Sequence, residues 1–236
     1  MGQPTAKSRT GLRRLDISTL EMILLVALIS LYDFLLSDAL SIPVALQHSA
    51  LLPYRVWDRV LSGLEYLVPV LVFTVMVILW LMGRNAWVRT TAIVYLGWVT
   101  LRLVMKVALV LSLIIARRNV ALSVLLKDTI VLWVVIILLF GIWYWILDRG
   151  GPHARRERLG LRPDFGFPQY LAIPGWQEWQ PGFWDYVFLG FSGSTQFGLG
   201  DVSPLSVRSK LLVILHVMLS ILVLVFIASI AIGAIR

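Results

Sequence analysis

The residues most able to do chemistry lie in a short polar stretch between two apolar segments. Residues 195 to 201 read Thr-Gln-Phe-Gly-Leu-Gly-Asp, with Gly198 and Gly200 two positions apart. Glycine adopts positive φ at no steric cost, so this spacing would allow carbonyl groups to point the same way. Aligned carbonyl oxygens can replace the water shell of a cation. Because non-helical backbone at membrane depth is tolerated only inside protein or along a wet cavity, the stretch predicts a pore loop.

Other chemistries have little support in the sequence. The chain has no cysteine, which excludes disulfides and thiolate metal sites, and His48, His153 and His216 are too scattered to predict a metal cluster. Metalloprotease, nucleophile-elbow and phosphate-loop motifs are missing. The Ser-Gly-Ser at 192–194 has no histidine or acidic residue near it in the sequence. We therefore expect neither an enzyme nor a cofactor.

The segment 183–235 resembles the pore domain of the potassium-channel superfamily, in which a pore helix precedes a Thr-Thr-Val-Gly-Tyr-Gly-Asp filter and a proline follows. The matching residues are Phe191 in the pore helix and Thr195, Gly198, Gly200, Asp201 and Pro204 after it. Gln196 and Leu199 depart from the pattern, which has a threonine and an aromatic residue there, so potassium selectivity does not carry over with the architecture. The sequences at 164–169 and 179–186 are also similar to those of uncharacterised bacterial inner-membrane protein families.

This resemblance implies a cation channel, with potassium as one candidate ion, and a homotetramer, since each chain supplies one pore loop. The implied filter consists of Thr195, Gln196, Phe197, Gly198, Leu199, Gly200 and Asp201. The carbonyl groups of 197–200 would coordinate ions, Thr195 and Gln196 would line the inner mouth, and Asp201 would brace the loop or attract cations. The alternative is a non-conducting membrane protein of interaction or assembly type, whose glycines only form a turn before the last helix.

The composition indicates a membrane protein. At 59% hydrophobic and 14% charged residues, with a mean hydropathy of +0.86, the chain has too few polar residues for a soluble globule of 236 residues. We expect an all-α, polytopic bundle of about five transmembrane helices, with a re-entrant helix and filter-like loop before the last one. The expected spans are 17–36, 66–83, 87–116, 129–147 and 207–234. The net charge of +8 is attributed to membrane-flanking arginines and not to nucleic-acid binding.

Four regions are expected along the chain. They are a basic cytoplasmic tail at 1–16, a four-helix membrane region at 17–148, a basic and then Pro/Trp-rich loop at 149–182, and the pore-like unit at 183–236. Within the second region, residues 41–63 are expected to form a loop or a helix lying at the interface. The small residues at 37–39 would also suit a cleaved signal peptide, but an uncleaved first helix is favoured.

Charges inside the spans predict specific contacts. Arg102 and Lys106, four residues apart, share one face of the third span and need a partner at that depth. Asp33 of the first span is the predicted partner. His216 in the last span is more typical of a hydrogen-bonded interface residue than of a gate. The basic part of the loop, 149–162, suits either anionic lipid heads or a cytoplasmic location, and the second is favoured.

The expected topology contains a conflict. From a cytoplasmic N-terminus in a bacterial inner membrane, four crossings return the chain to the cytoplasm at residue 149, in agreement with the arginines there. The pore loop of the potassium-channel family enters from the outside instead. If the third segment lay along the membrane interface, three crossings would precede the pore loop, which would then enter from the outside. The basic loop would in that case also lie outside.

Overall fold

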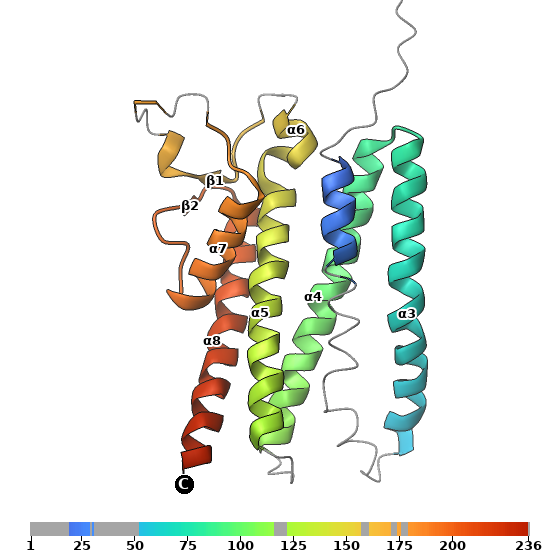
Figure 1. Cartoon of the computed structure of the whole chain (residues 1–236), viewed down its shortest axis with the longest axis vertical. Coiled ribbons are helices and arrows are strands. Elements are labelled where there is room, and N and C mark those ends of the chain that lie inside the picture. Colours follow the sequence, from blue (N-terminus) through green and yellow to red (C-terminus); the bar gives the residue numbers. More distant parts are fainter. Residues whose placement is uncertain are drawn as a thin grey trace, which may run out of the picture.

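Four long helices dominate the structure, a computed structural model that describes residues 19–28, 30, 52–115, 122–156, 161–170, 174–175 and 179–235. They are α3 (Leu52–Leu81), α4 (Asn85–Ile115), α5 (Leu122–Leu147) and α8 (Val207–Ile235). They run alternately up and down one bundle, and the shorter helix Thr19–Leu28 packs beside them (Figure 1). The described chain is thus predominantly helical, as expected.

Three helices are long and apolar enough to cross a membrane. These spans are Asn85–Ala108, Leu125–Gly150 and Val207–Gly233, close to three of the predicted ones. The other two expected crossings coincide with shorter apolar helices, Thr19–Leu28 and Leu67–Leu81. An integral membrane protein with at least three candidate spans follows, and the total of five stays a prediction.

Helix α3 differs from the prediction in its length. It begins at Leu52 and continues through Pro69 to Leu81, so residues 52–63 belong to the same helix as the apolar segment that follows. For these residues the expectation of a loop is therefore wrong, whereas the alternative, a helix lying at the interface, stays a prediction; residues 41–51 lie outside the described residues. Pro53 lies in the first turn of the helix, where a missing backbone N–H costs nothing.

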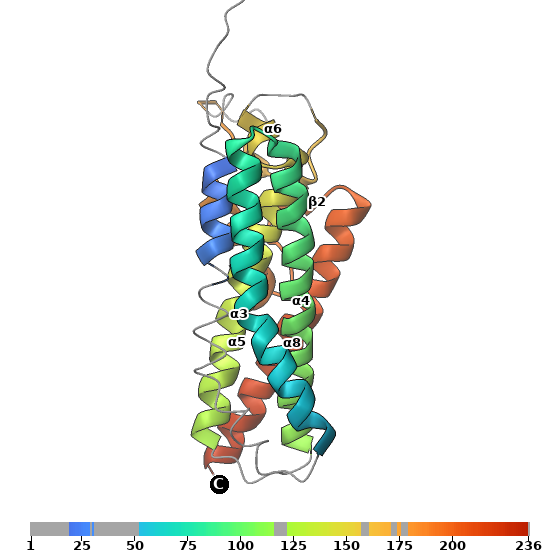
Figure 2. The ribbon, with the colours of Figure 1, turned by 90° about the vertical axis from the view of Figure 1, so that its right-hand side faces the viewer.

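Helix α4 lies between α3 and α5 (Figure 1), and it runs along the bundle and not across its end (Figure 2). Its buried side chains recur every three or four residues, which is the pattern of a helix with one face in a core. They are Val88, Ala92, Tyr95, Leu96, Val99, Leu103 and Val107. The interfacial orientation that would have restored the parity of a conventional potassium channel is thus not the one observed.

The short elements gather at one end of the bundle. They are η1 (Asp148–Gly150), α6 (Pro152–Arg156), β1 (Phe165–Gly166), η2 (Pro168–Tyr170), α7 (Phe183–Thr195) and β2 (Ser203–Pro204). Strand β1 pairs antiparallel with β2, with Phe165 opposite Pro204 and Gly166 opposite Ser203. Helix α7 runs from this end toward the middle of the bundle, and the following loop returns to β2 at the same end (Figure 1). We refer to residues 183–204 as the helix–loop hairpin.

Glycines bring α7 against α5 at backbone distance. A methyl group built on Gly141 of α5 would lie 3.1 Å from the Cα of Val187, and one built on Gly190 of α7 would overlap the carbonyl oxygen of Ile137. Two helices can approach this closely only where side chains are absent from the contact. The depth of the hairpin in the bundle therefore depends on these two residues.

Replacing Gly190 by alanine is expected to lower the free energy of unfolding by about 1–3 kcal/mol, because the new methyl group must push α7 away from α5. The measurement is SDS-induced unfolding of the purified protein in mild detergent. Gly97→Ala on α4 is the matched control, since no atom lies within 4 Å of its methyl position. Equal stability of the two variants would contradict the close contact between α5 and α7.

Candidate functional site

Helix α7 delivers the predicted filter residues to the loop. The Asp185 carboxylate accepts a hydrogen bond from the Gly182 N–H at 2.7 Å, which fixes the start of the helix. At the other end, the Gln196 N–H donates to the Ser192 carbonyl at 2.8 Å, and the Thr195 hydroxyl donates to the Phe191 carbonyl at 2.9 Å. Thr195 is therefore the last helical residue, and α7 lies where a helix was expected, directly before the filter-like loop.

The backbone of the loop differs in detail from the glycine argument. Positive φ falls on Phe197 (57°) and Gly200 (63°), and Gly198 has none. The Val202 N–H donates to the Leu199 carbonyl at 3.4 Å, which closes a turn. Gly200 thus has the positive φ that was expected of it. The second positive φ, expected at Gly198, occurs at Phe197 instead. Cation coordination by 197–200 remains a prediction.

One buried side chain, that of Leu199, holds the loop against the bundle, and its neighbours in the loop are more exposed. Leu199 is buried, with its Cδ2 atom 3.5 Å from the methyl position of Gly193. Gln196 and Phe197 are exposed, and no atom lies within 4 Å of the methyl position of Gly198. The loop therefore rests on α7 through one leucine, and its backbone near Gly198 has free space beside it.

A buried polar cluster holds the C-terminal end of α7. His216 of α8 shares a hydrogen bond of 2.8 Å with the Ser194 hydroxyl through Nε2 and one of 2.7 Å with the Tyr144 hydroxyl through Nδ1. The Ser220 hydroxyl donates to Ser194 at 3.2 Å, and Phe140 stacks on the imidazole at 4.4 Å. Three helices, α5, α7 and α8, are joined in this way directly behind the loop.

The cluster bears on two predictions from the sequence, one about Ser194 and one about His216. Ser194, which has no histidine near it in the sequence, contacts His216 across 22 positions. Ser194 and His216 are both fully buried, so neither water nor a substrate reaches them, and the pair does not indicate a hydrolytic site. His216 is hydrogen-bonded through both ring nitrogens, which agrees with the prediction of a hydrogen-bonded residue. However, it lies in the core of the bundle and not at the membrane interface.

Gly193 explains why α7 can lie against the imidazole. A methyl group at this position would come within 2.7 Å of Cε1 and 2.8 Å of Nδ1 of His216. A separation under 3.0 Å is closer than carbon atoms pack, so only glycine leaves room for the ring. The Ser-Gly-Ser sequence thus combines one hydrogen-bonding hydroxyl, Ser194, with the gap that His216 needs.

A second network secures the two ends of the hairpin. The buried Asp148 carboxylate accepts hydrogen bonds from the Asp164 N–H at 2.7 Å, the Phe165 N–H at 3.3 Å and the Tyr186 hydroxyl at 2.6 Å. The Asp148 carbonyl accepts one from Arg155 Nη1 at 2.7 Å. Asp148 therefore links the end of α5 to β1 and to the first turns of α7.

Asp164 continues this network to α8. Its carboxylate accepts two hydrogen bonds from Arg208, both of 2.7 Å, and its carbonyl accepts one from the Ser209 hydroxyl at 2.9 Å. Burial alone would raise the pKa of Asp164, but hydrogen bonds from Arg208 and Ser206 and the Arg208 charge lower it below its usual value. The contribution of this pair to stability is therefore present at neutral pH and is lost as the pH falls through that lowered pKa.

The sequence did not single out Asp148, Asp164, Tyr144 or Tyr186. A carboxylate directly after the apolar span 129–147 was a signal for Asp148, since a charge at that place must be paired or reach water. Of the predicted intramembrane charges, Arg102 is buried and Lys106 half-buried on α4. Asp33 lies outside the described residues, so its pairing with Arg102 stays a hypothesis.

Comparison of the chain with protein-family models, with curated proteins and with solved structures found no match. The class of protein therefore follows from the fold alone. It is a helical membrane-type bundle in which a helix–loop hairpin is inserted next to the last span.

Proposed function

We propose that this chain is the pore-forming subunit of a channel for monovalent cations, with the backbone of 197–200 lining the ion path. The observation that carries the proposal is the hairpin, which begins and ends at one end of the bundle and between those points reaches toward the middle of its length beside α5 and α8 (Figure 1). Its loop is held from behind by Leu199 and by the His216 cluster. The C-terminal end of α7, which carries a partial negative charge, lies at the loop and favours a cation there.

A pore of this kind needs several copies of the chain, because one loop cannot surround an ion. The hairpin and α8 together present an apolar surface that has no partner within the described chain. Its exposed residues include Trp184, Phe188, Phe191, Phe197, Ile214, Met218 and Val225. Only 28% of the last span is buried, compared with 61% of the span in α5. We propose that neighbouring subunits of a homotetramer cover part of this surface and that lipid covers the remainder.

The proposed pore is inverted relative to the potassium-channel family. The end of the bundle at which the hairpin is inserted also carries Arg84, Arg89, Arg149, Arg155 and Arg208. The excess of arginine around this end favours the cytoplasm, with the N-terminus on the same side of a bacterial inner membrane. The hairpin then enters from the cytoplasm. In this orientation the basic loop lies in the cytoplasm, as its arginines favour. Only the side from which the pore loop enters then differs from the potassium-channel family.

The alternative is a non-conducting assembly protein, and one observation favours it. The loop closes a turn through the Val202 to Leu199 hydrogen bond, and its positive φ values fall on Phe197 and Gly200 without regular alternation. Such a turn needs no ion. The two readings differ in whether the purified protein conducts.

Purified protein in liposomes is expected to pass K⁺ or Na⁺, and Gly198→Ala is expected to reduce this flux to the level of protein-free liposomes. The four added methyl groups would meet near the shared axis, although each has free space within its own subunit. Gly97→Ala on α4 is the control and should conduct normally. A monomer in mild detergent, or a wild-type protein without flux, would instead favour the assembly protein.

A further inference from the structure

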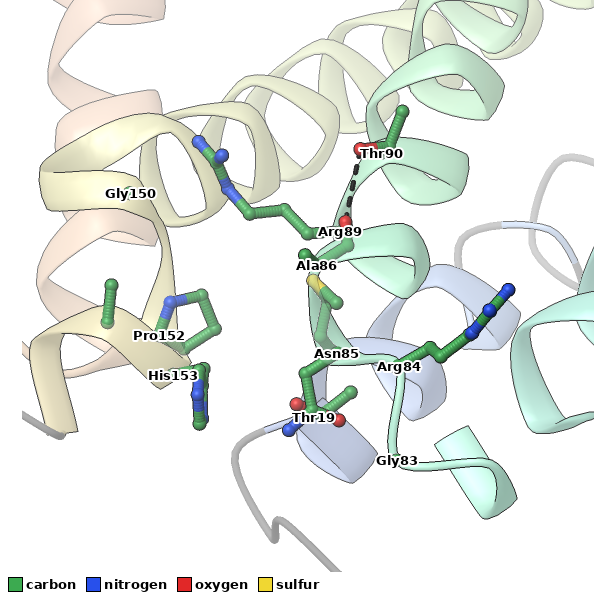
Figure 3. Close-up of a pocket in the computed structure, with 12 residues that line it drawn as sticks. Thr19, Gly83, Arg84, Asn85, Ala86, Arg89, Thr90, Gly150, Pro152 and His153 are labelled. Atoms are coloured by element: carbon green, nitrogen blue, oxygen red, sulfur yellow. Dashed lines mark hydrogen bonds between the residues drawn. The ribbon is translucent and has the colours of Figure 1, made fainter. Parts of the chain in front are cut away.

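A second site candidate is a cavity at the arginine-rich end, away from the hairpin. It has a volume of about 500 Å³ and lies between the start of α4, the segment after α5 and the helix Thr19–Leu28. Figure 3 shows Arg84, Asn85 and Arg89 on one side of it and Pro152 and His153 on the other, with the side chain of Arg84 extending away from Pro152 and His153. A cavity of this size accommodates a small polar molecule or the headgroup of a lipid.

The side chains around this cavity favour an anion. Arg84, Arg89 and His153 line it together with Thr19 and Thr90, and no acidic side chain of the described residues does so. In the described part of the chain, neither Arg84 nor Arg89 forms an ion pair with a carboxylate. The N-terminus of the 31-residue helix α4 adds partial positive charge at the same place.

Arg89 is held in position without being neutralised. Its Nε donates a long hydrogen bond of 3.4 Å to the Ile146 carbonyl, and its side chain lies 3.1 Å from the methyl position of Gly151, where φ is +94°. Arg155 and Arg208 add positive charge around it, and Asp164 adds negative charge but is engaged by Arg208. Arg89 thus supplies a fixed positive charge at the cavity.

The position of the cavity identifies the source of the anion. It lies at the ends of two candidate spans, which begin at Asn85 and end at Gly150, where the hydrocarbon core gives way to lipid headgroups. The apolar side chain of Met22 is part of the lining, next to the polar groups. We propose that this cavity binds the phosphate of an anionic phospholipid, with Arg89 as its fixed charged donor and with Arg84 turning toward the phosphate on binding.

The test measures dissociation constants of the full-length protein in mild detergent for three probes: short-chain phosphatidylglycerol, short-chain phosphatidylcholine and inorganic phosphate. We expect phosphatidylglycerol to bind at least about tenfold more tightly than the other two. Arg84→Gln and Arg89→Gln should each weaken its binding about tenfold, or about 1.4 kcal/mol, as expected for the loss of a charged hydrogen bond. Arg84 is exposed, so its variant should fold even if the Arg89 variant does not.

Arg162→Gln is the matched control. Arg162 is exposed and lies in the same basic loop region but does not line the cavity, so its variant should bind phosphatidylglycerol like the wild type. Equal weakening by this variant would mean that diffuse charge, and not the cavity, attracts the lipid. Binding of inorganic phosphate as tight as that of phosphatidylglycerol would overturn the assignment to a lipid and leave a site for free phosphate.

Discussion

Replacing Asp148 with alanine is expected to lower the free energy of unfolding by about 3–5 kcal/mol. The carboxylate is completely buried and accepts hydrogen bonds from two backbone N–H groups, of Asp164 and Phe165, and from the Tyr186 hydroxyl. Alanine would leave these donors without acceptors in the core, and the loss of the charge would remove a favourable interaction with Arg208. No other single side chain in the described residues connects α5, β1 and α7 in this way.

The measurement is again SDS-induced unfolding in mild detergent, followed by tryptophan fluorescence. Tyr186→Phe removes one of the three hydrogen bonds and should cost about 1–3 kcal/mol, because it leaves part of the carboxylate unsatisfied. Asp148→Asn keeps the shape of the side chain and should fall between the wild type and the alanine variant. If Asp148→Ala unfolds at the same SDS concentration as the wild type, the network does not hold the hairpin.

The parts of the fold that depend on local pattern were predictable. Long apolar runs gave the spans in α4, α5 and α8 because crossing a bilayer requires about 20 apolar residues whatever lies around them. Helix α7 was also expected, and its end at Thr195 follows from the glycines and polar residues after it. Pro53 could have indicated the start of α3, since proline is common in the first turn of a helix. The charged residues of 52–63 favoured a loop or an interfacial helix instead.

The site was less predictable because its contacts are distant in the sequence. His216 reaches Ser194 across 22 positions and Tyr144 across 72, and a single histidine in an apolar helix does not reveal either partner. Asp148 and Asp164 form a network only because α5 and β1 meet at one end of the bundle. The conformation of Phe197 was also missed. Glycine tolerates positive φ best, so the glycine spacing pointed to Gly198, but the loop has its first positive φ at Phe197.

The proposed ion path is tested most directly by the current through single channels in planar bilayers, measured on cysteine variants. The chain has no cysteine of its own, so a positively charged methanethiosulfonate reagent can react only with an introduced one. Gln196 is exposed at the loop, and Trp87 is 60% exposed in the first turn of α4, away from the proposed path.

The account predicts a cation current in the wild-type protein that the reagent leaves unchanged. The reagent should abolish the current of Gln196→Cys and spare that of Trp87→Cys, because only the first side chain lies at the path. A wild-type protein without current, or equal sensitivity of the two cysteine variants, would contradict conduction through the helix–loop hairpin.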